Sequence, residues 1–412
     1  MDGIAQSDRD DLVRRVGSLS ERFVDAGWRF FVVGGVVRDL LLGKRSGDID
    51  ITTDAHPEET ASILADWGGV VWDQGARFGT IGARSGDVVV EVTTHRSEQY
   101  EETSRKPQVK FSGAIEDDLA RRDFTVNSMA IELPSWRLVD PFSGREHLEQ
   151  GVLSTPLGPQ TAFSEDPLRM LRAARFIAGY GLTPDQELED AIASIAERLS
   201  IVSKERINDE MTKFLLVEQP GEGVALLQRT GLIQQIFPKA RNFEAIKPDA
   251  VNLVQPDLVA RWASLLWPVV GEAGSARSLL NDLRVSKSIS SQVAAILDAC
   301  QQLTQAADVN PSSIRRLLHA TRPNTVAAIT LVKAYGQAPP DEVLIAMNRL
   351  EEEEGTQSFE VPLDGFEVTD LIGKKGPDVG TTLNRLMEHR LDSGPLSKEE
   401  AIALVLEWQS SG

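Results

Sequence analysis

The pattern of apolar and polar residues divides the chain into a first part that mixes strands with helices and a longer second part that is helical. Over 8–26, apolar residues recur every three or four positions, which predicts an amphipathic helix. A short apolar run at Phe30–Val33 predicts a buried strand. The elements expected in the first part are helices at 8–26 and 57–67 and strands at 30–33, 70–72, 78–83 and 88–93.

Beyond about residue 176 the sequence shows no convincing strand alternation, and the apolar periodicity predicts one helix after another, separated by short glycine and proline breaks. The expected helices are 188–199, 207–216, 223–232, 256–269, 277–283 and 290–303. The acidic run at 351–354, closed by Gly355, predicts a solvated helix end or a linker. Because 412 residues exceed one ordinary domain, we expect roughly two to four structural units.

The composition is that of a soluble globular protein, since 41% of the residues are hydrophobic and 25% are charged. The single Cys300 excludes a disulfide within the chain and fits a reducing cytoplasm. No stretch has the apolar length of a membrane span or the features of a signal peptide, so a cytoplasmic location is expected. The net charge of −19 argues against a broad nucleic-acid surface, although a local basic stripe is enough to hold one end of an RNA.

The most informative stretch joins a glycine turn to two acidic residues. Gly34 and Gly35 follow the strand at 30–33 and leave backbone N–H groups open to close approach by an anion. Asp48 and Asp50 lie two positions apart in the next strand, so both project from one face. Neighbouring carboxylates repel each other unless a cation lies between them, and two Mg²⁺ ions are the usual solution. Either motif alone is more often a plain turn or a solvated strand edge, but the combination predicts a triphosphate site with its metals.

A second set of candidates lies at 121–127. The guanidinium pair of Arg121 and Arg122 can neutralise phosphate, and Asp123 or Asn127 can hydrogen-bond ribose hydroxyls. Taken from the residues alone, the same stretch is a helix start with solvated charges.

A third set lies at 164–176, where Ser164 predicts a helix N-cap. Asp166, Arg169, Arg172 and Arg175 then recur every three residues along the predicted helix. A carboxylate beside a guanidinium complements the amino donor and ring-nitrogen acceptor that cytosine and adenine share. Uracil and guanine would turn a carbonyl toward the carboxylate, so such a pair rejects them without a nucleic-acid template. The alternative is an exposed helix with solvated arginines.

These motifs resemble those of the polymerase-β-like nucleotidyltransferases. In the form Gly-Gly-x-x-Arg-Asp, followed by Arg-Arg-Asp and Glu-Asp-x-x-Arg, they resemble the class II tRNA nucleotidyltransferase (CCA-adding enzyme) and bacterial poly(A) polymerase family. The resemblance implies an α+β fold, with a polymerase-β-like nucleotidyltransferase head containing a mixed β-sheet, followed by an all-helical neck, body and tail. The implied domains are a head at 1–140, a neck with the nucleotide-selecting helix at 141–215, a body at 216–335 and a tRNA-binding tail at 336–412.

The resemblance also implies roles for individual residues. Asp48 and Asp50 hold two Mg²⁺ ions and are catalytic, with Glu91 as a third carboxylate, although a single acid in a strand is more often simply solvated. Asp166 and Arg169 act as an amino-acid template for the base. The implied nucleotide-binding residues are Gly34, Gly35, Arg38, Arg121, Arg122, Asp123, Asn127, Asp166, Arg169, Arg172 and Arg175. A helix at 207–216 buttresses the pocket, where Arg206 and Glu210 could pair, and Lys374 and Lys375 could contact tRNA phosphate.

The implied reaction is the template-independent addition of C and A, as CCA, to the 3′ end of tRNA from CTP and ATP, with release of pyrophosphate, by a monomer or homodimer. In the family, the loop before the Arg-Arg-Asp motif is linked to addition of the final A. The polar stretch 94–120 predicts a mobile loop of nearly full length that keeps Arg105, Lys106 and Pro107, so full CCA addition is expected. The alternatives are addition of A alone, addition of CC alone, poly(A) polymerase, a small-molecule nucleotidyltransferase and a non-catalytic RNA-binding module.

Overall fold

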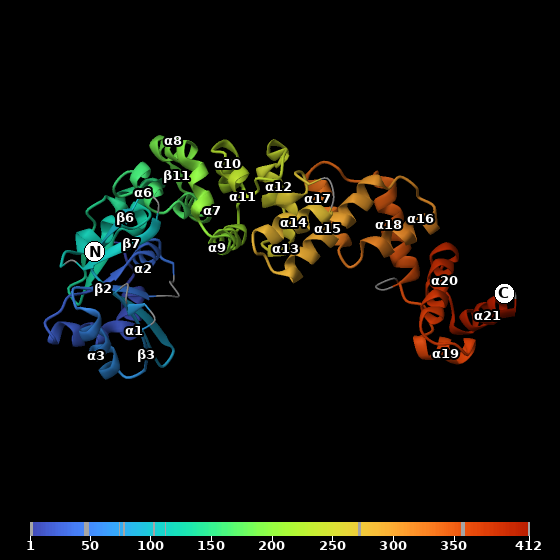
Figure 1. The fold of residues 1–412 in the computed structure, drawn as a ribbon, viewed down its shortest axis with the longest axis horizontal. Coiled ribbons are helices and arrows are strands. Elements are labelled where there is room, and N and C mark those ends of the chain that lie inside the picture. The colour runs from blue at the N-terminus through green and yellow to red at the C-terminus, as the bar shows by residue number, and fades with distance from the viewer. Residues whose placement is uncertain are drawn as a thin grey trace. The chain divides into compact units, whose positions relative to one another are not determined.

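The computed structural model divides the chain into two compact units, Met1–Pro238 and Lys239–Gly412 (Figure 1). The structure describes residues 3–44, 49–73, 75–76, 79–101, 104–111, 113–270, 273–355 and 359–410, the side chains of 97–101 and 104–110 excepted. Within these ranges, no helix is long and apolar enough to cross a membrane. The expected division into four domains stays a prediction, and its body at 216–335 includes residues of both units.

The first unit combines strands and helices in the part of the chain that is described. Its strands are β1 (Phe30–Val33), β2 (Ile49–Thr53), β3 (Val70–Trp72), β4 (Thr80–Ser85), β5 (Val88–Thr94), β6 (Arg96–Glu101), β7 (Ser104–Phe111), β8 (Ala130–Leu133), β9 (Arg137–Val139), β10 (Val152–Leu153) and β11 (Thr183–Pro184). Its helices are α1 (Gln6–Asp25), α2 (Gly35–Leu41), α3 (Pro57–Trp67), α4 (Ile115–Ala120), the 3₁₀ helix η2 (Thr125–Asn127), α5 (Gly144–Gln150), α6 (Pro159–Glu165), α7 (Leu168–Tyr180), α8 (Gln186–Ile195), η3 (Ala196–Ile201), α9 (Lys204–Leu215), α10 (Gly221–Arg229) and α11 (Leu232–Ile236).

A mixed sheet forms the centre of the head, in the order β3–β4–β5–β2–β1–β8–β9. Strands β2 and β5 pair in parallel, and the other described neighbours pair antiparallel, which confirms the expected mixed sheet. Strand β1 is buried along its whole length, because all four of its residues are apolar. The apolar face predicted for α1 is buried, and Phe23 packs on Phe30 with their ring centroids 5.4 Å apart.

The stretch predicted to be a mobile loop, 94–120, contains regular structure instead. Strands β6 and β7 pair antiparallel as a two-stranded sheet, and α4 follows at Ile115–Ala120. Pro107 lies within β7, where a proline is tolerated because both strands of such a ribbon are edges. The prediction was wrong because it was drawn from polar side chains, whereas this hairpin is defined by backbone pairing.

The helix predicted to start at Ser164 is also different in the structure. Ser164 lies inside α6, which ends at Glu165, and α7 begins at Leu168. Asp166, between them, is extended with φ −135° and ψ 97°. The physical reason is Pro167, whose ring disfavours the helical conformation in the residue before it. The neck was expected to be all-helical, but it also contains β10 and β11, which pair in parallel.

The second unit is helical in its described residues, as predicted. Its elements are η4 (Phe243–Ala245), α12 (Pro248–Asn252), α13 (Leu258–Leu266), α14 (Ala273–Asp282), α15 (Lys287–Gln305), α16 (Pro311–Thr321), α17 (Thr325–Ala334), α18 (Asp341–Glu354), α19 (Gly365–Ile372), α20 (Pro377–Ser393) and α21 (Lys398–Ser410). Trp262 is fully buried in α13, in agreement with a packing role. Cys300 is buried in α15, and burial raises the pKa of its thiol to about 12.

A buried cluster of charged residues joins three helices of the second unit. The Nε of Arg315 on α16 donates to Glu354 Oε1 over 2.8 Å, and Arg390 Nη2 on α20 lies 3.0 Å from Glu354 Oε2. Glu354 therefore does not lie on a solvated helix end, as the acidic run at 351–354 predicted. Arg322 donates to Glu351 in the same run. The prediction is confirmed for the helix end, because α18 ends in this run and its two middle glutamates are exposed. It was wrong for Glu351 and Glu354, because their arginine partners are distant in sequence.

Candidate active site

The glycine turn connects β1 to α2, and its geometry requires glycine at one position. Gly34 has φ +77°, a conformation that residues with a side chain rarely adopt. A Cβ atom at Gly34 would lie 2.7 Å from Nη1 of Arg122. At Gly35 the nearest contact is Arg38 Nη2 at an ordinary 3.5 Å. The backbone of this turn thus lies directly against the Arg122 guanidinium, which connects two of the predicted motifs.

The exposed carboxylates lie on the two parallel strands of the sheet. Asp50 on β2 is paired in register with Glu91 on β5, and both side chains are exposed, while Ile49 and Ile51 on either side of Asp50 are buried. Residues paired across parallel strands project from the same face, so the structure brings Asp50 and Glu91 together. Asp48 lies outside the described residues.

The arginine pair lies at the end of α4, not at a helix start as the residues alone suggested. Asp118 Oδ1 accepts hydrogen bonds from Arg121 Nε at 3.0 Å and Nη2 at 2.6 Å, and its Oδ2 accepts from Arg122 Nη2 at 3.1 Å. Burial favours the neutral form of Asp118, but the Arg122 and Arg121 guanidiniums outweigh it and lower the pKa of the carboxyl. Asp118 was not among the predicted residues, although its helical spacing from both arginines could have indicated it.

Asp123 connects η2 to α7 through its carboxylate. Its Oδ1 accepts from Asn127 Nδ2 at 2.9 Å, and its Oδ2 accepts from Arg172 Nε at 2.8 Å and Nη2 at 2.5 Å. Burial acts against ionisation, but Arg172 and the hydrogen bond from Asn127 hold the pKa of Asp123 well below its usual range. Three predicted residues therefore form one hydrogen-bonded group.

Arg38 extends this group to the glycine turn. Its Nη1 donates to Asn127 Oδ1 over 2.6 Å, and its Nε donates to Asp39 Oδ1 over 2.9 Å. The guanidinium also lies 4.0 Å from the ring centroid of Tyr180, a residue that the sequence did not single out. Burial raises the pKa of Tyr180, so its hydroxyl stays protonated near neutral pH. Arg38 is thus held from three sides beside Gly35.

The predicted base-selecting pair is held by hydrogen bonds outside the pair. Asp166 Oδ2 accepts from Arg206 Nη2 at 2.7 Å. Arg169 Nη2 donates to the backbone carbonyl of Arg121 over 2.6 Å, and its Nη1 donates to Glu165 Oε2 over 3.2 Å. The structure therefore places both residues at the junction of α6, α7 and α4.

Arg175, one turn below Arg172 on α7, donates through Nε to Glu210 Oε1 over 2.5 Å. The suggested pair of Arg206 with Glu210 is therefore wrong. Glu210 accepts from Arg175 on α7, and Arg206 donates to Asp166, which lies between α6 and α7. The helix still buttresses α7, because Glu210 is buried there. Spacing within one helix does not predict an ion pair whose second residue lies on a different element.

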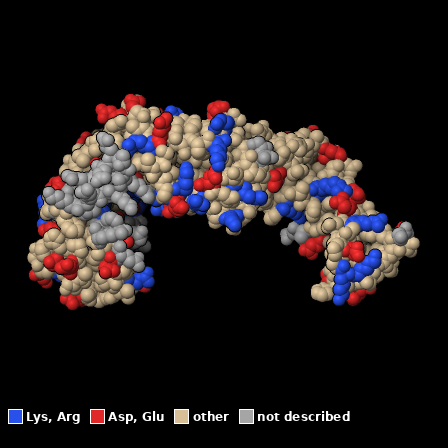
Figure 2. Space-filling view, in the orientation of Figure 1, with Lys and Arg blue, Asp and Glu red and all other residues tan. Residues whose placement is uncertain are grey.

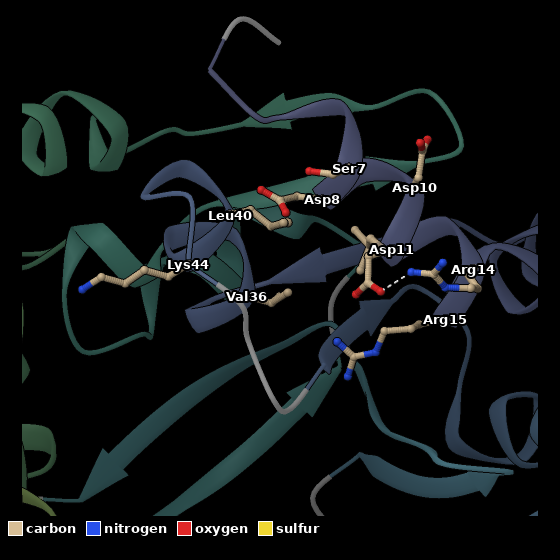
Figure 3. A pocket seen from close by; sticks show the side chains of 10 residues that line it. Ser7, Asp8, Asp10, Asp11, Arg14, Arg15, Val36, Leu40 and Lys44 are labelled. Atoms are coloured by element: carbon tan, nitrogen blue, oxygen red, sulfur yellow. Dashed lines mark hydrogen bonds and ion pairs between the residues drawn. The ribbon is translucent and has the colours of Figure 1, made fainter.

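A separate cleft of about 610 Å³ lies between α1 and α2 (Figure 3). Asp8, Asp11 and Arg15 line it from α1, and Lys44 lines it beyond the end of α2. Asp11 is paired with Arg14. None of the predicted site residues lines this cleft, and its charges are of both signs, so the chemistry is assigned to the glycine turn and carboxylates instead.

Two protein families match parts of the first 243 residues. Residues 30–154 match the poly A polymerase head domain, and residues 181–243 match the probable RNA and SrmB-binding site of polymerase A. The first match covers the glycine turn, Asp50, Glu91 and the arginine pair. The fold and site thus define a nucleotidyltransferase of the poly(A) polymerase head class.

Curated relatives define the family more closely. The CCA-adding enzyme of Anoxybacillus flavithermus is 30% identical over 388 residues, which cover 91% of both chains. The CCA-adding enzyme of Geobacillus thermodenitrificans is 32% identical over 367 residues, covering 87% of this chain and 88% of that one. The chain belongs to the family of CCA-adding enzymes, the tRNA nucleotidyltransferases, as the sequence motifs had predicted.

Solved structures of this family share the fold. The CCA-adding enzyme of Bacillus stearothermophilus in complex with CTP has a TM-score of 0.76 and 26% identity, covering 97% of this chain and 98% of that one. The Thermotoga maritima CCA-adding enzyme complexed with tRNA has a TM-score of 0.71 at 20% identity, and this likeness concerns the fold alone.

Proposed function

We propose that the protein adds C and A, as CCA, to the 3′ end of tRNA from CTP and ATP, without a nucleic-acid template and with release of pyrophosphate. The observation that carries this proposal is the arrangement around the glycine turn. Arg122 lies against Gly34, and Asp50 and Glu91 lie side by side on the exposed face of the sheet. Asp166 precedes α7, and Arg169 lies in its first turn.

The carboxylates fit a divalent cation. Asp50 and Glu91 are exposed and paired in register, so their oxygens offer the hard ligands that Mg²⁺ prefers. Among the described residues no group of three or more His, Cys, Asp or Glu side chains forms a metal site, and Asp48, the predicted partner of Asp50, lies outside them. Two Mg²⁺ ions held by Asp48 and Asp50 would lower the pKa of the primer hydroxyl and neutralise charge on the leaving pyrophosphate.

The remaining residues bind and orient the nucleotide. The guanidiniums of Arg121, Arg122 and Arg172 are fixed by buried carboxylates and face the triphosphate as a fixed positive set. Gly34 and Gly35 allow the phosphates to approach the backbone. Orientation of the tRNA hydroxyl in line with the α-phosphate then supplies much of the rate.

Base selection is assigned to Asp166 and Arg169. Arg206 holds one oxygen of Asp166, and Arg169 is anchored to the Arg121 carbonyl, so both side chains are oriented before a base arrives. Cytosine and adenine match a carboxylate acceptor beside guanidinium donors, whereas uracil and guanine do not.

The tail is proposed to bind tRNA. A cleft of about 510 Å³ lies on α20 and α21, and in it Arg385 lies 4.1 Å from the ring centroid of Trp408. Lys374 also lines this cleft. On the face that Figure 2 shows, basic and acidic side chains are interspersed. A cytoplasmic monomer or homodimer is the expected form.

Three tRNA transcripts separate CCA addition from its alternatives. One lacks CCA, one lacks CA and one lacks only the terminal A. The proposal expects CTP to extend the first two and ATP to extend the third. Inability to use CTP on the first transcript indicates an A-adding enzyme, inability to use ATP on the third indicates a CC-adding enzyme, and long A tails on any RNA indicate a poly(A) polymerase.

A further inference from the structure

Asp118 is a fully buried carboxylate that none of the predicted motifs contains. It lies in the last turn of α4 and accepts three hydrogen bonds from Arg121 and Arg122. Both guanidiniums therefore bond to the same carboxylate. A buried carboxylate with this many charge-assisted hydrogen bonds fixes the directions of its partners.

The two arginines stay partly exposed although the acid that holds them is enclosed. Their side chains keep 17% and 18% of their surface exposed, whereas Asp118 keeps none. Arg122 lies against Gly34, and the backbone carbonyl of Arg121 accepts a hydrogen bond from Arg169. Asp118 is therefore connected to the glycine turn on one side and to the base-selecting arginine on the other.

Behind Asp118 lies the root of the β6–β7 hairpin. His95, directly before β6, is fully buried and packs on Phe31 with their ring centroids 5.5 Å apart. Burial lowers the pKa of His95, and the charge of Asp118 acts in the opposite direction. Helix α4 also packs against β6. Asp118 thus lies between the hairpin and the arginine pair.

We propose that Asp118 is a positioning residue for nucleotidyl transfer: it holds Arg121 and Arg122 in the orientation that binds the triphosphate and, through the Arg121 carbonyl, supports Arg169. This inference rests on the proposed function, because it assigns the two arginines to nucleotide binding. Asp118 does not itself contact substrate. It acts through its two partners.

The test compares Asp118→Asn with the wild type in nucleotide binding and in turnover. Asparagine keeps the shape but loses the charge, so the guanidiniums lose their common anchor. We expect the Kd for CTP, measured by calorimetry without tRNA, to rise about tenfold or more, as for loss of a charge-assisted hydrogen bond. KM for CTP should rise more than kcat falls. The matched control is Glu116→Gln, an exposed acid on the same helix, which should bind CTP as the wild type does.

A double-mutant cycle distinguishes positioning from a purely structural role. If Asp118 acts through Arg122, then Asp118→Asn should weaken CTP binding much less in an Arg122→Ala background than in the wild type. Full additivity of the two effects overturns the proposal, as does an unchanged Kd in a folded Asp118→Asn variant. Should Asp118→Asn not fold, the double variant with Arg121→Ala removes one of the two guanidiniums that Asp118 holds and is compared with Arg121→Ala alone. Equal affinity of those two also overturns it.

The same measurements keep this inference separate from the proposed function. A wild-type protein that binds CTP but adds nothing to tRNA contradicts the proposed function and leaves the Asp118 cycle interpretable. A wild type that extends tRNA, combined with an Asp118→Asn variant of unchanged affinity and KM, contradicts the positioning role alone.

Discussion

Both units bury a carboxylate between arginines, but the two clusters differ in what remains exposed. In the first unit, Asp118 is enclosed while 17% of the Arg121 side chain and 18% of the Arg122 side chain stay exposed. In the second unit, Arg315, Glu354 and Arg390 all keep 10% or less. Arg315 also donates to the backbone carbonyls of Leu391 and Asp392. The second cluster therefore uses its hydrogen bonds to join α16, α18 and α20.

The difference indicates how to tell a binding cluster from a structural one. An enclosed acid that holds partly exposed guanidiniums prepares a positive surface in advance of a polyanion. An acid whose arginines are enclosed as well contributes to packing, and the loss of one partner leaves a charge buried without compensation. Substitutions in the first cluster should thus reduce activity with little change in stability. Substitutions in the second cluster should reduce stability with little change in activity.

The largest effect on activity is expected for Asp50→Ala. Asp50 is exposed between buried Ile49 and Ile51, so the strand keeps its core contacts while the proposed metal site loses a ligand. We expect nucleotide addition to fall on the order of 10³-fold or more, with the melting temperature unchanged within a few degrees. Single-turnover extension of tRNA with Mg²⁺, alongside thermal unfolding, measures both. Substantial remaining activity would show that the metal assignment is wrong.

Arg169→Ala should produce the next largest loss of activity and should also change specificity. The variant removes the donors offered to cytosine and adenine and frees the Arg121 carbonyl. We expect discrimination against UTP and GTP to fall by about 10–100-fold, because a hydrogen bond to a charged group is worth roughly 1.5–3 kcal/mol. Ratios of kcat/KM for the four nucleotides measure the effect. A folded variant that discriminates as the wild type does excludes the template role.

Glu354→Gln should reverse this pattern in the second unit. Breaking a buried ion pair typically costs about 3–5 kcal/mol, since the remaining charges are left unpaired. We expect the unfolding transition of this unit to fall by roughly 6–15 °C, while kcat with saturating nucleotide and tRNA changes less than about twofold. Glu353→Gln, on the same helix and exposed, is the control. A large loss of kcat without a loss of stability would contradict the distinction between the two clusters.

The smallest effect is expected from His95, and it depends on pH. Burial lowers the pKa of His95, although Asp118 and Asp54 act in the opposite direction. Because the folded pKa lies below the ordinary value of about 6.5, the unfolded chain takes up a proton first as the pH falls. The contribution of neutral His95 to the free energy of unfolding is therefore fully present above about pH 6.5. It is lost as the pH falls through the pKa of His95 in the folded protein.

Melting temperatures at pH 7.5 and 5.5 measure this contribution. We expect the wild type to lose a few degrees more than His95→Gln over that interval. His56→Gln, at an exposed position, should behave as the wild type does. An equal loss in wild type and His95→Gln would mean that another group titrates.

Structural features that depend on residue spacing within one helix, strand or turn could be predicted from the sequence. The glycine turn, the alternation around Asp50 and the apolar face of α1 follow from spacing within one element, and the structure shows each of them. The register that brings Asp50 beside Glu91 could not be predicted, because it depends on pairing between strands that are far apart in the chain. The family resemblance suggested their proximity, but periodicity did not.

Partners of charged residues were the least predictable part of the site. Arg206 was expected to pair with Glu210 on its own helix, yet it contacts Asp166, and Glu210 contacts Arg175. The partner of Glu210 lies on a different helix, so spacing within one helix does not predict this pair. The buried partners of Glu354 are likewise supplied by other helices, α16 and α20.

The parallel pairing of β2 with β5 has a consequence for insertions and deletions. Side chains alternate between the two faces of a strand, so a shift of one residue within β5 would turn Glu91 toward the core and a valine toward the carboxylates. Length changes inside this strand are thus tolerated, if at all, in steps of two. The turn at Gly86 lies between β4 and β5 and has open space around it, so an added residue there can be accommodated without moving Glu91. A library of single-residue insertions across 80–94 should therefore retain activity around residue 86 and lose it on the β5 side.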